Sequence, residues 1–247
     1  MGRLSGKTAL ITGCNRGIGK EILERFVQEG CNIIACTRNI PDSLIESYHK
    51  LESEYGIKIT PIAMDLSDEQ SVKDGMKSAM AACEVIDILV NNAGVAAGGL
   101  ALMTSMKTLH DVFQINYFSQ VLITQYVEKK MMKQKSGSII NMSSTMGLES
   151  FAGGTSYGAS KAALAYFTRT LSKELGAYNI RVNAIAPNLT DTEMAKEMEK
   201  KAYTSIVENT ALKRVGQISE IVNVAVFLAS DESSYISGQI MRVDGGL

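Results

Sequence analysis

The chain has 247 residues, of which 45% are hydrophobic and 21% charged, and these proportions predict one globular domain, 1–247, with a substantial core. The net charge is −1 and the basic residues are scattered, which argues against a nucleic-acid-binding protein. No apolar run of about 18 residues occurs, and the N-terminus lacks a signal-peptide or transit pattern. We therefore expect a cytoplasmic protein with no membrane partner. The four cysteines form no C-x-x-C pair and the two histidines lie far apart, so no metal site is expected.

Apolar runs of strand length alternate with helical patterns along the chain. The strand candidates are 8–12, 32–37, 58–64, 86–91, 138–142, 181–186 and 239–243. The helical patterns lie near 17–29, 42–55, 69–83, 104–134, 155–178 and 219–229. Most strand candidates are apolar throughout, which is typical of strands covered on both faces. The fold class predicted is α/β: a single doubly wound Rossmann-type domain, with a parallel sheet of about seven strands and helices on both faces.

One region, 188–216, interrupts this alternation. It is polar, rich in methionine and contains no strand candidate. In open α/β sheets, ligands bind beyond the carboxyl ends of the strands. We therefore expect 188–216 to form a substrate lid within the domain.

A glycine-rich segment follows the first strand candidate and opens the first helical pattern. It reads Thr12-Gly13-Cys14-Asn15-Arg16-Gly17-Ile18-Gly19. Its glycines permit a tight turn and a close approach of the backbone to a pyrophosphate at the helix N-terminus. The spacing is G-x-x-x-G-x-G, which is neither the common G-x-G-x-x-G fingerprint nor a Walker loop. Its place after the first strand favours dinucleotide binding over an ordinary glycine-rich turn.

The end of the second strand candidate indicates which dinucleotide is bound. An NAD-binding protein typically has a carboxylate there, on the ribose hydroxyls. Here the sequence is Cys36-Thr37-Arg38, without an acid. Arg38 and Arg16 can pair with a 2′-phosphate, although either can equally be a solvated surface residue. The pattern predicts NADP(H) as the cofactor.

Tyr157 and Lys161 are four residues apart in a predicted helix, and Ser144 lies upstream. Residues i and i+4 share a helix face, so the ammonium can sit beside the phenol. We expect this charge to lower the pKa of the phenol from about 10 to about 7, as general acid–base catalysis requires. Ser144 can then hydrogen-bond a carbonyl or alkoxide oxygen. Taken alone, the pair is also compatible with an ordinary surface contact.

Together these residues resemble the motifs of the short-chain dehydrogenase/reductase family, over essentially the whole chain. Further matches are Asp65-Leu66, Asn91-Asn92-Ala93-Gly94, Asn116, and Pro187 with Thr190 and Thr192. The resemblance implies that Asn116, Ser144, Tyr157 and Lys161 are catalytic, with Asn116 and Lys161 in a proton relay. It implies that the cofactor-binding residues are Thr12, Gly13, Asn15, Arg16, Gly17, Ile18, Gly19, Thr37, Arg38, Asp65, Leu66, Asn92, Ala93, Gly94, Tyr157, Lys161, Pro187, Thr190 and Thr192.

Within the family, the C-terminal segments are most similar to 3-oxoacyl-(acyl-carrier-protein) reductases. In that group Lys135 falls where a basic residue contacts the carrier protein. Tyr178 departs from a second basic position, and 95–100 lacks the group's usual Thr-Arg-Asp run. Asn188 replaces a glycine. The first two departures concern the carrier-linked substrate, and the third concerns the shape of a loop.

The function predicted is NADPH-dependent reduction of a ketone to a secondary alcohol, with a 3-oxoacyl thioester of fatty acid biosynthesis as the preferred substrate. One alternative keeps the reaction but changes the substrate to a sugar, a diketone, a steroid or another small ketone. Another is a catalytically silent NADP-binding sensor. The resemblance also implies a homotetramer, and apolar residues of the two longest helical patterns, such as Val112, Phe113, Leu164 and Phe167, are expected at its interfaces.

Overall fold

The computed structural model describes residues 2–196 and 200–247. A seven-stranded parallel sheet forms its centre, in the order β3-β2-β1-β4-β5-β6-β7. The strands are β1 (Thr8–Thr12), β2 (Asn32–Thr37), β3 (Ile59–Ala63), β4 (Ile88–Asn91), β5 (Gly137–Met142), β6 (Ile180–Pro187) and β7 (Ile240–Val243). Each lies within two residues of a predicted strand. The predicted fold class is therefore confirmed.

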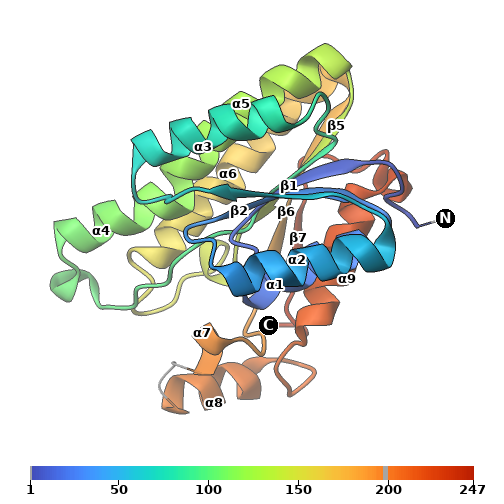
Figure 1. The fold of residues 1–247 in the computed structure, drawn as a ribbon. Helices are drawn as coiled ribbons and strands as arrows, with labels where there is room; N and C mark the ends of the chain where they lie inside the picture. The colour runs from blue at the N-terminus through green and yellow to red at the C-terminus, as the bar shows by residue number, and fades with distance from the viewer. Residues whose placement is uncertain (1, 197–199) are drawn as a thin grey trace.

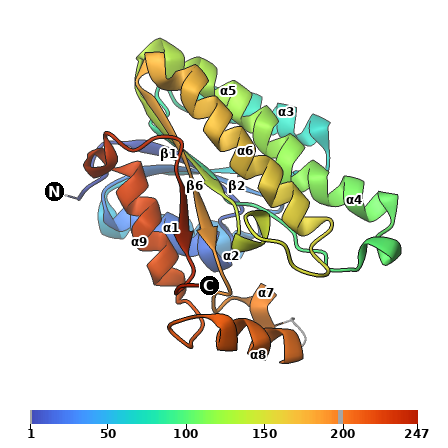
Figure 2. The same ribbon diagram turned by 180° about the vertical axis from the view of Figure 1, so that it is seen from behind.

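Helices cover both faces of the sheet (Figure 1). On one face lie α1 (Gly17–Gln28), α2 (Asp42–Tyr55) and α9 (Ile218–Ala229). On the other lie α3 (Glu69–Ala82), α5 (Ser119–Gln134) and α6 (Tyr157–Leu175), as the reverse view also shows (Figure 2). Along β1, Ala9 and Ile11 pack into the first layer and Leu10 into the second. This double coverage explains why the strands are apolar throughout.

The helical pattern predicted over 104–134 divides into three pieces. These are α4 (Met106–Phe113), a π-helical turn η2 (Gln114–Phe118) and α5. Short 3-10 turns also occur at η1 (Ala101–Met103), η3 (Thr145–Gly147), η4 (Gly176–Tyr178) and η5 (Asp231–Ser233). A π turn inserts one residue into a helix and is frequent at functional sites. Here it carries Asn116.

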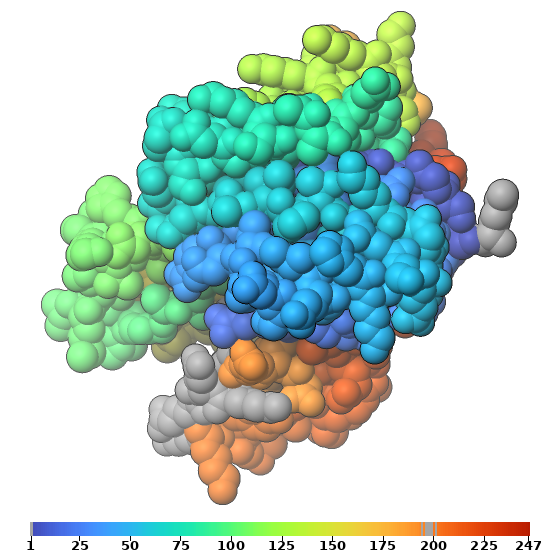
Figure 3. All heavy atoms as spheres, in the orientation of Figure 1, coloured from blue at the N-terminus to red at the C-terminus, as the bar shows by residue number. Residues whose placement is uncertain are grey.

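The predicted lid, 188–216, contains the short helix α7 (Glu193–Lys196) and the helix α8 (Lys200–Asn209). Both lie beyond one end of the sheet, and in the space-filling view this orange segment projects below α2 (Figure 3). A backbone bridge between Thr190 and Gly216 closes the segment at its base. Whether it acts as a lid stays a prediction.

Two apolar residues expected at subunit interfaces are buried inside the chain instead. Val112 is 3% exposed and Leu164 is 1% exposed, so both belong to the chain's own core. The periodicity that identified them also describes a helix face packed on its own sheet. Exposed aromatic side chains on this side of the sheet include Phe118 of the π turn, at 50%, and Tyr166 of α6, at 73%. That part of the interface prediction was wrong.

No helix in the described ranges is long and apolar enough to cross a membrane. In the same ranges no group of three or more His, Cys, Asp or Glu side chains is placed to hold a metal ion.

Candidate active site

The strand order reverses between β1 and β4, and such a switch point forms a crevice at the carboxyl ends of the strands. The glycine-rich loop after β1 and the loop after β4 meet there. Asn92 Nδ2 donates to the carbonyls of Thr12, at 2.9 Å, and Gly13, at 3.2 Å. The Thr12 hydroxyl oxygen accepts from the backbone N–H groups of Asn92 and Ala93, each at 3.0 Å. The two loops are thus one hydrogen-bonded unit.

The glycines of this loop have distinct physical roles. A Cβ at Gly13 would lie 2.9 Å from the Ala93 Cα atom, and one at Gly19 only 2.3 Å from Asn92 Nδ2 of the loop after β4. These two positions therefore need glycine because the loops pack so closely. Gly17 has φ +55° and a Cβ there would meet no atom within 4 Å, so it needs glycine for its left-handed turn rather than for space.

The N-terminus of α1 has the character of an anion site. Arg16 precedes the helix, its side chain caps no backbone group, and the first turn contains no acidic residue. Uncapped N–H groups and the helix dipole favour a phosphate at this end. Asn15 is exposed and Ile18 is half-buried, packed against the core. The residues present fit the pyrophosphate of a dinucleotide.

Arg16 and Arg38, the two cations expected at a 2′-phosphate, are both exposed. Arg16 forms an ion pair with Glu193 of α7, 3.2 Å apart, with both side chains more than 70% exposed. The Thr37 hydroxyl is buried and donates to the Asn39 carbonyl at 3.0 Å. Arg38 is therefore the better-placed of the two expected cations to meet a ligand beyond β2.

Asp65 and Leu66 follow β3. Asp65 Oδ1 accepts from both the N–H and the hydroxyl of Ser67, and these bonds lower the pKa of its carboxyl group, with a smaller contribution from Arg38. The Leu66 carbonyl accepts from the Ser119 hydroxyl at 2.7 Å. Asp65 remains an ionised acceptor at the crevice, as an adenine contact requires.

Ser144 and Tyr157 come together at the carboxyl edge of the sheet. Ser144 caps η3, where its Oγ atom accepts from the Met146 N–H at 3.2 Å, and it is 8% exposed. Tyr157 is the first residue of α6. A hydrogen bond joins the Ser144 hydroxyl to the Tyr157 phenol. The two groups form one polar unit beside the crevice.

Lys161 lies one turn along α6 with its ammonium buried. Its Nζ atom is 5.7 Å from the centroid of the Tyr157 ring and donates to the Met142 carbonyl at 2.7 Å. The side chain is 4% exposed, and burial lowers its pKa to about 8. No carboxylate of the described residues offsets this effect. A charge held without an opposite partner is typical of functional rather than structural sites.

The expected lowering of the Tyr157 pKa is wrong for the protein chain alone. Burial raises the pKa of the phenol above its ordinary value of 10, and the hydrogen bond with Ser144 offsets this only in part. Lys161 lies over the ring face and donates to Met142, so its charge does not compensate the loss of water around the phenol. Tyr157 is accordingly a neutral proton donor at neutral pH.

Asn116 holds the π turn to the loop after β4. Its Oδ1 atom accepts from the Val95 N–H and its Nδ2 atom donates to the Val95 carbonyl, both at 2.9 Å. Nδ2 also donates to the Ser160 hydroxyl at 3.0 Å. A Cβ at Gly94 would lie 3.2 Å from both Asn116 Oδ1 and Lys161 Nζ, so the three meet. Both ends of the side-chain amide thus have partners within the protein, and the role of Asn116 in a proton relay stays a prediction.

Pro187 is the last residue of β6, and local hydrogen bonds stabilise the segment that follows it. The Thr190 hydroxyl donates to the Asn188 carbonyl at 3.0 Å, and the Thr192 hydroxyl accepts from the Ala195 N–H at 3.3 Å. Asn188 Nδ2 also donates to Thr210 at 3.2 Å. The departure from glycine at Asn188 thus ties the two ends of the predicted lid together.

Two supporting residues were not predicted. The Ser143 hydroxyl donates to the Lys161 carbonyl at 3.0 Å, and Ser160 bridges Asn116 and the Tyr157 carbonyl. Both occupy positions next to predicted catalytic residues, so adjacency was the available signal. Their partners depend on tertiary contacts, which a linear pattern does not contain.

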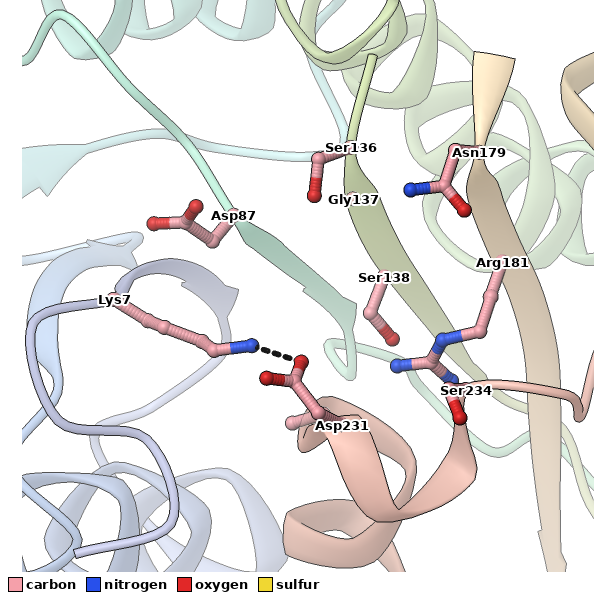
Figure 4. Close-up of a pocket in the computed structure, with 10 residues that line it drawn as sticks. Lys7, Asp87, Ser136, Gly137, Ser138, Asn179, Arg181, Asp231 and Ser234 are labelled. Carbon is pink, nitrogen blue, oxygen red and sulfur yellow. Dashed lines mark hydrogen bonds and ion pairs between the residues drawn. The ribbon is translucent and has the colours of Figure 1, made fainter. Parts of the chain in front are cut away.

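A cavity of about 130 Å³ lies at the opposite edge of the sheet, where the strands begin (Figure 4). Lys7 and Asp231 face each other across it, with Nζ and Oδ1 2.6 Å apart. Arg181 donates to Ser233 Oγ and to the Leu228 and Ser230 carbonyls. These charged groups already have partners within the chain, an ion pair for Lys7 and Asp231 and hydrogen bonds for Arg181, so we place the candidate site at the carboxyl edge.

Comparison with known proteins agrees with this site. A family model described as enoyl-(acyl carrier protein) reductase matches residues 13–247. A 3-oxoacyl-(acyl-carrier-protein) reductase of Thermotoga maritima is 38% identical, over 99% of both chains.

Two solved structures are also similar. One, assigned as an NAD(P)-dependent gluconate 5-dehydrogenase of Beutenbergia cavernae with bound NADP, has a TM-score of 0.91 at 29% identity, covering 98% of this chain and 96% of that one. The other is a 7α-hydroxysteroid dehydrogenase complexed with NADH and an oxo bile acid, with a TM-score of 0.89 at 32% identity, covering 99% and 95%. The chain belongs to the short-chain dehydrogenase/reductase family, and it is an oxidoreductase that acts on CH–OH and C=O groups with a nicotinamide cofactor.

Proposed function

We propose that this protein reduces the ketone of a 3-oxoacyl thioester to a secondary alcohol, with NADPH as the reductant. The observation that carries the proposal is the set of Ser144, Tyr157 and Lys161 at the mouth of the crevice, with a neutral phenol hydrogen-bonded to a hydroxyl beside an ammonium that has no opposite charge. A serine, a proton donor and a buried cation suit a carbonyl that gains hydride and a proton.

In this mechanism Tyr157 gives its phenolic proton to the carbonyl oxygen while Ser144 donates a hydrogen bond that orients the same oxygen. The nicotinamide, when bound, supplies the hydride. Once the phenol has given up its proton, the positive charge of Lys161 beside the ring favours the phenolate, although by less than burial disfavours it. Asn116 fixes Val95 and Ser160, and through them the spacing between Gly94 and α6.

The preference for NADPH is supported by the end of β2. It carries Thr37 and the exposed Arg38 where an NAD-binding protein typically carries a carboxylate. A guanidinium can pair with a 2′-phosphate in a charge-assisted fork. The similar structure with bound NADP agrees with this choice, although the structure with NADH shows that the fold serves both.

The choice of substrate rests on the relatives. The Thermotoga protein, named for a carrier-linked 3-oxoacyl substrate, matches the whole chain at higher identity than the steroid dehydrogenase does. Lys135, expected at the carrier protein, is exposed at the end of α5 in a left-handed conformation with φ 54°. We place the reaction in fatty acid biosynthesis on this ground.

We also propose a homotetramer. The exposed aromatic residues Phe118 and Tyr166, on the layer formed by α5 and α6, give this face apolar area that a second copy can cover. Light scattering at micromolar concentration is expected to give four times the chain mass. A mass near 26.7 kDa would contradict the assembly.

The substrate is tested by NADPH oxidation with acetoacetyl-CoA, a carrier-linked 3-oxoacyl thioester and a panel of simple ketones, sugars and oxosteroids. We expect the highest kcat/KM with the carrier-linked thioester. A higher value with a small ketone or a steroid would move the proposal to that substrate class. Cofactor binding without turnover of any substrate would favour a silent sensor.

A further inference from the structure

A buried polar side chain, Gln120, supports the cofactor loop from behind. Gln120 is the second residue of α5, directly after the π turn, and it is 0% exposed. Its Nε2 atom donates to the Ala93 carbonyl at 2.8 Å and to the Ile115 carbonyl at 3.3 Å. Ala93 belongs to the loop after β4, whose other side is held by Thr12. Gln120 therefore links the π turn to the cofactor loop.

The acceptor end of the same amide has no partner. Gln120 Oε1 is buried and accepts a hydrogen bond from none of the described residues. Its orientation is fixed, because exchanging the amide ends would turn an acceptor toward the two carbonyls that Nε2 now serves. A buried acceptor left unpaired costs free energy, and such groups are ordinarily satisfied by ordered water.

A second unpaired acceptor lies in the same part of the core. Asn91 Nδ2 donates to the Thr124 hydroxyl, at 2.9 Å, and to Asn141 Oδ1, at 2.8 Å, whereas Asn91 Oδ1 has no donor within the described residues. The Thr124 hydroxyl donates to the Gln120 carbonyl at 2.7 Å. Both amides thus converge on one turn of α5, between Gln120 and Thr124.

We propose that Gln120 is a positioning residue for the cofactor loop, and that buried water donates hydrogen bonds to Gln120 Oε1 and Asn91 Oδ1. Water fits because it supplies one donor for each acceptor. A metal cation would need several more oxygen ligands than these two, and both residues are buried, with Gln120 0% and Asn91 1% exposed. Gln120 thereby holds the Ala93 carbonyl in the loop that would contact the nicotinamide cofactor.

The proposal rests on the cofactor class and not on the substrate, so its test needs no ketone. The affinities for NADPH and NADH are measured by calorimetry for the wild type, Gln120→Met and Gln120→Glu. Gln120→Met removes both ends of the amide, and Gln120→Glu replaces its two N–H donors with a carboxylate or with the single O–H of a protonated carboxyl group. We expect both variants to bind the preferred cofactor about 5- to 30-fold more weakly, because the Ala93 carbonyl loses its donor.

Val127→Ala is the matched control. Val127 is a fully buried residue of α5 two turns further on, so this change weakens the core without touching the cofactor loop. We expect a lower Tm with cofactor affinity within about twofold of the wild type. If Gln120→Met lowered Tm but left the cofactor affinity within about twofold of the wild type, as expected for Val127→Ala, Gln120 would be merely structural. The positioning role would then be overturned.

The water is tested separately in the wild-type protein, which avoids reliance on any variant. A crystal structure at high resolution is expected to show ordered density within hydrogen-bond distance of both Gln120 Oε1 and Asn91 Oδ1. Density at neither atom, or at only one of them, would overturn the proposed water site.

Discussion

At the amino edge of the sheet, the Arg181 guanidinium donates to two carbonyls and a hydroxyl, and Asp231 lies close enough to favour its charge. At the carboxyl edge, the ammonium of Lys161 is more deeply buried, yet among the described residues it has one carbonyl as a partner and no carboxylate. Burial lowers the pKa of both groups. The lowering of the pKa is large only for Lys161, at the carboxyl edge.

This difference separates a structural cation from a functional one. An uncompensated buried charge reduces stability, so a protein retains it where the charge has another use. The cavity at the amino edge is a defined hollow in the surface, but Lys7 and Asp231 form an ion pair there and Arg181 is held by three hydrogen-bond acceptors. The unmatched charge, and not the shape of the cavity, identifies the site.

The largest effect is expected from Tyr157→Phe, which removes the proton donor and keeps the ring. We expect kcat to fall by about 10²- to 10⁴-fold. Cofactor affinity should barely change, because the phosphate loop lies elsewhere. Steady-state kinetics with a cofactor titration measures both. A variant that retained a tenth of the wild-type kcat would remove Tyr157 from the mechanism.

Lys161→Met is expected to inactivate the enzyme and to stabilise the fold. Lys161 has a pKa near 10.5 when unfolded and about 8 when folded, so the unfolded chain binds more protons between these values. The destabilisation is complete below pH 8 and disappears as pH rises toward 10.5. We expect a gain of about 1–2 kcal/mol at pH 7, after the lost bond to Met142 is allowed for.

Denaturant unfolding at pH 7 and at pH 10 tests this expectation. The gain in stability from Lys161→Met should shrink at the higher pH. A gain that stays constant or grows with pH would mean that the ammonium is not the source of the destabilisation.

Arg181→Met is expected to act in the opposite direction at the amino edge. It removes the guanidinium donor from the Leu228 and Ser230 carbonyls, which keep donors from the Ser138 and Ser233 hydroxyls, so we expect a loss of about 0.5–1.5 kcal/mol. The kcat value should be near normal in the protein that remains folded. Denaturant unfolding and kinetics measure the two quantities. A stable Arg181→Met variant with a low kcat would contradict the assignment of a structural role to the amino edge and a functional role to the carboxyl edge.

The smallest effect is expected from Arg38→Leu, because Arg38 is exposed and solvent weakens its interactions. We expect KM for NADPH to rise about 5- to 20-fold and KM for NADH to stay within twofold. Glu193→Gln is the comparison variant, because it breaks the exposed ion pair of Arg16. We expect it to change the free energy of unfolding by less than about 1 kcal/mol. Equal losses with both cofactors in Arg38→Leu would refute recognition of the 2′-phosphate by this residue.

Much of the sheet was predictable because the strands are apolar on both sides and bounded by loops. The π turn was not, because Gln114–Phe118 continues an ordinary helical pattern and its extra residue is held by contacts between Asn116 and Val95, far apart in sequence. Val112 and Leu164 were misassigned because an apolar helix stripe looks the same whether it meets a sheet or a second subunit.

The candidate catalytic residues were predictable from their spacing, but their electrostatics were not. Spacing placed the Lys161 ammonium near the Tyr157 ring, as observed. The direction of the pKa shift of Tyr157 depends on how deeply the phenol and the ammonium are buried, and the sequence does not contain that information. Gln120 carried a usable signal: it is a polar residue that the helical period places on the buried face with Ile123 and Val127.

The central claim is that the carboxyl edge keeps a buried, unpaired ammonium for function. It is tested most directly by an NMR titration of the Lys161 side chain in the intact protein. A pKa of about 8 is predicted. A value near 10.5, the ordinary value of a solvated lysine, would contradict the account.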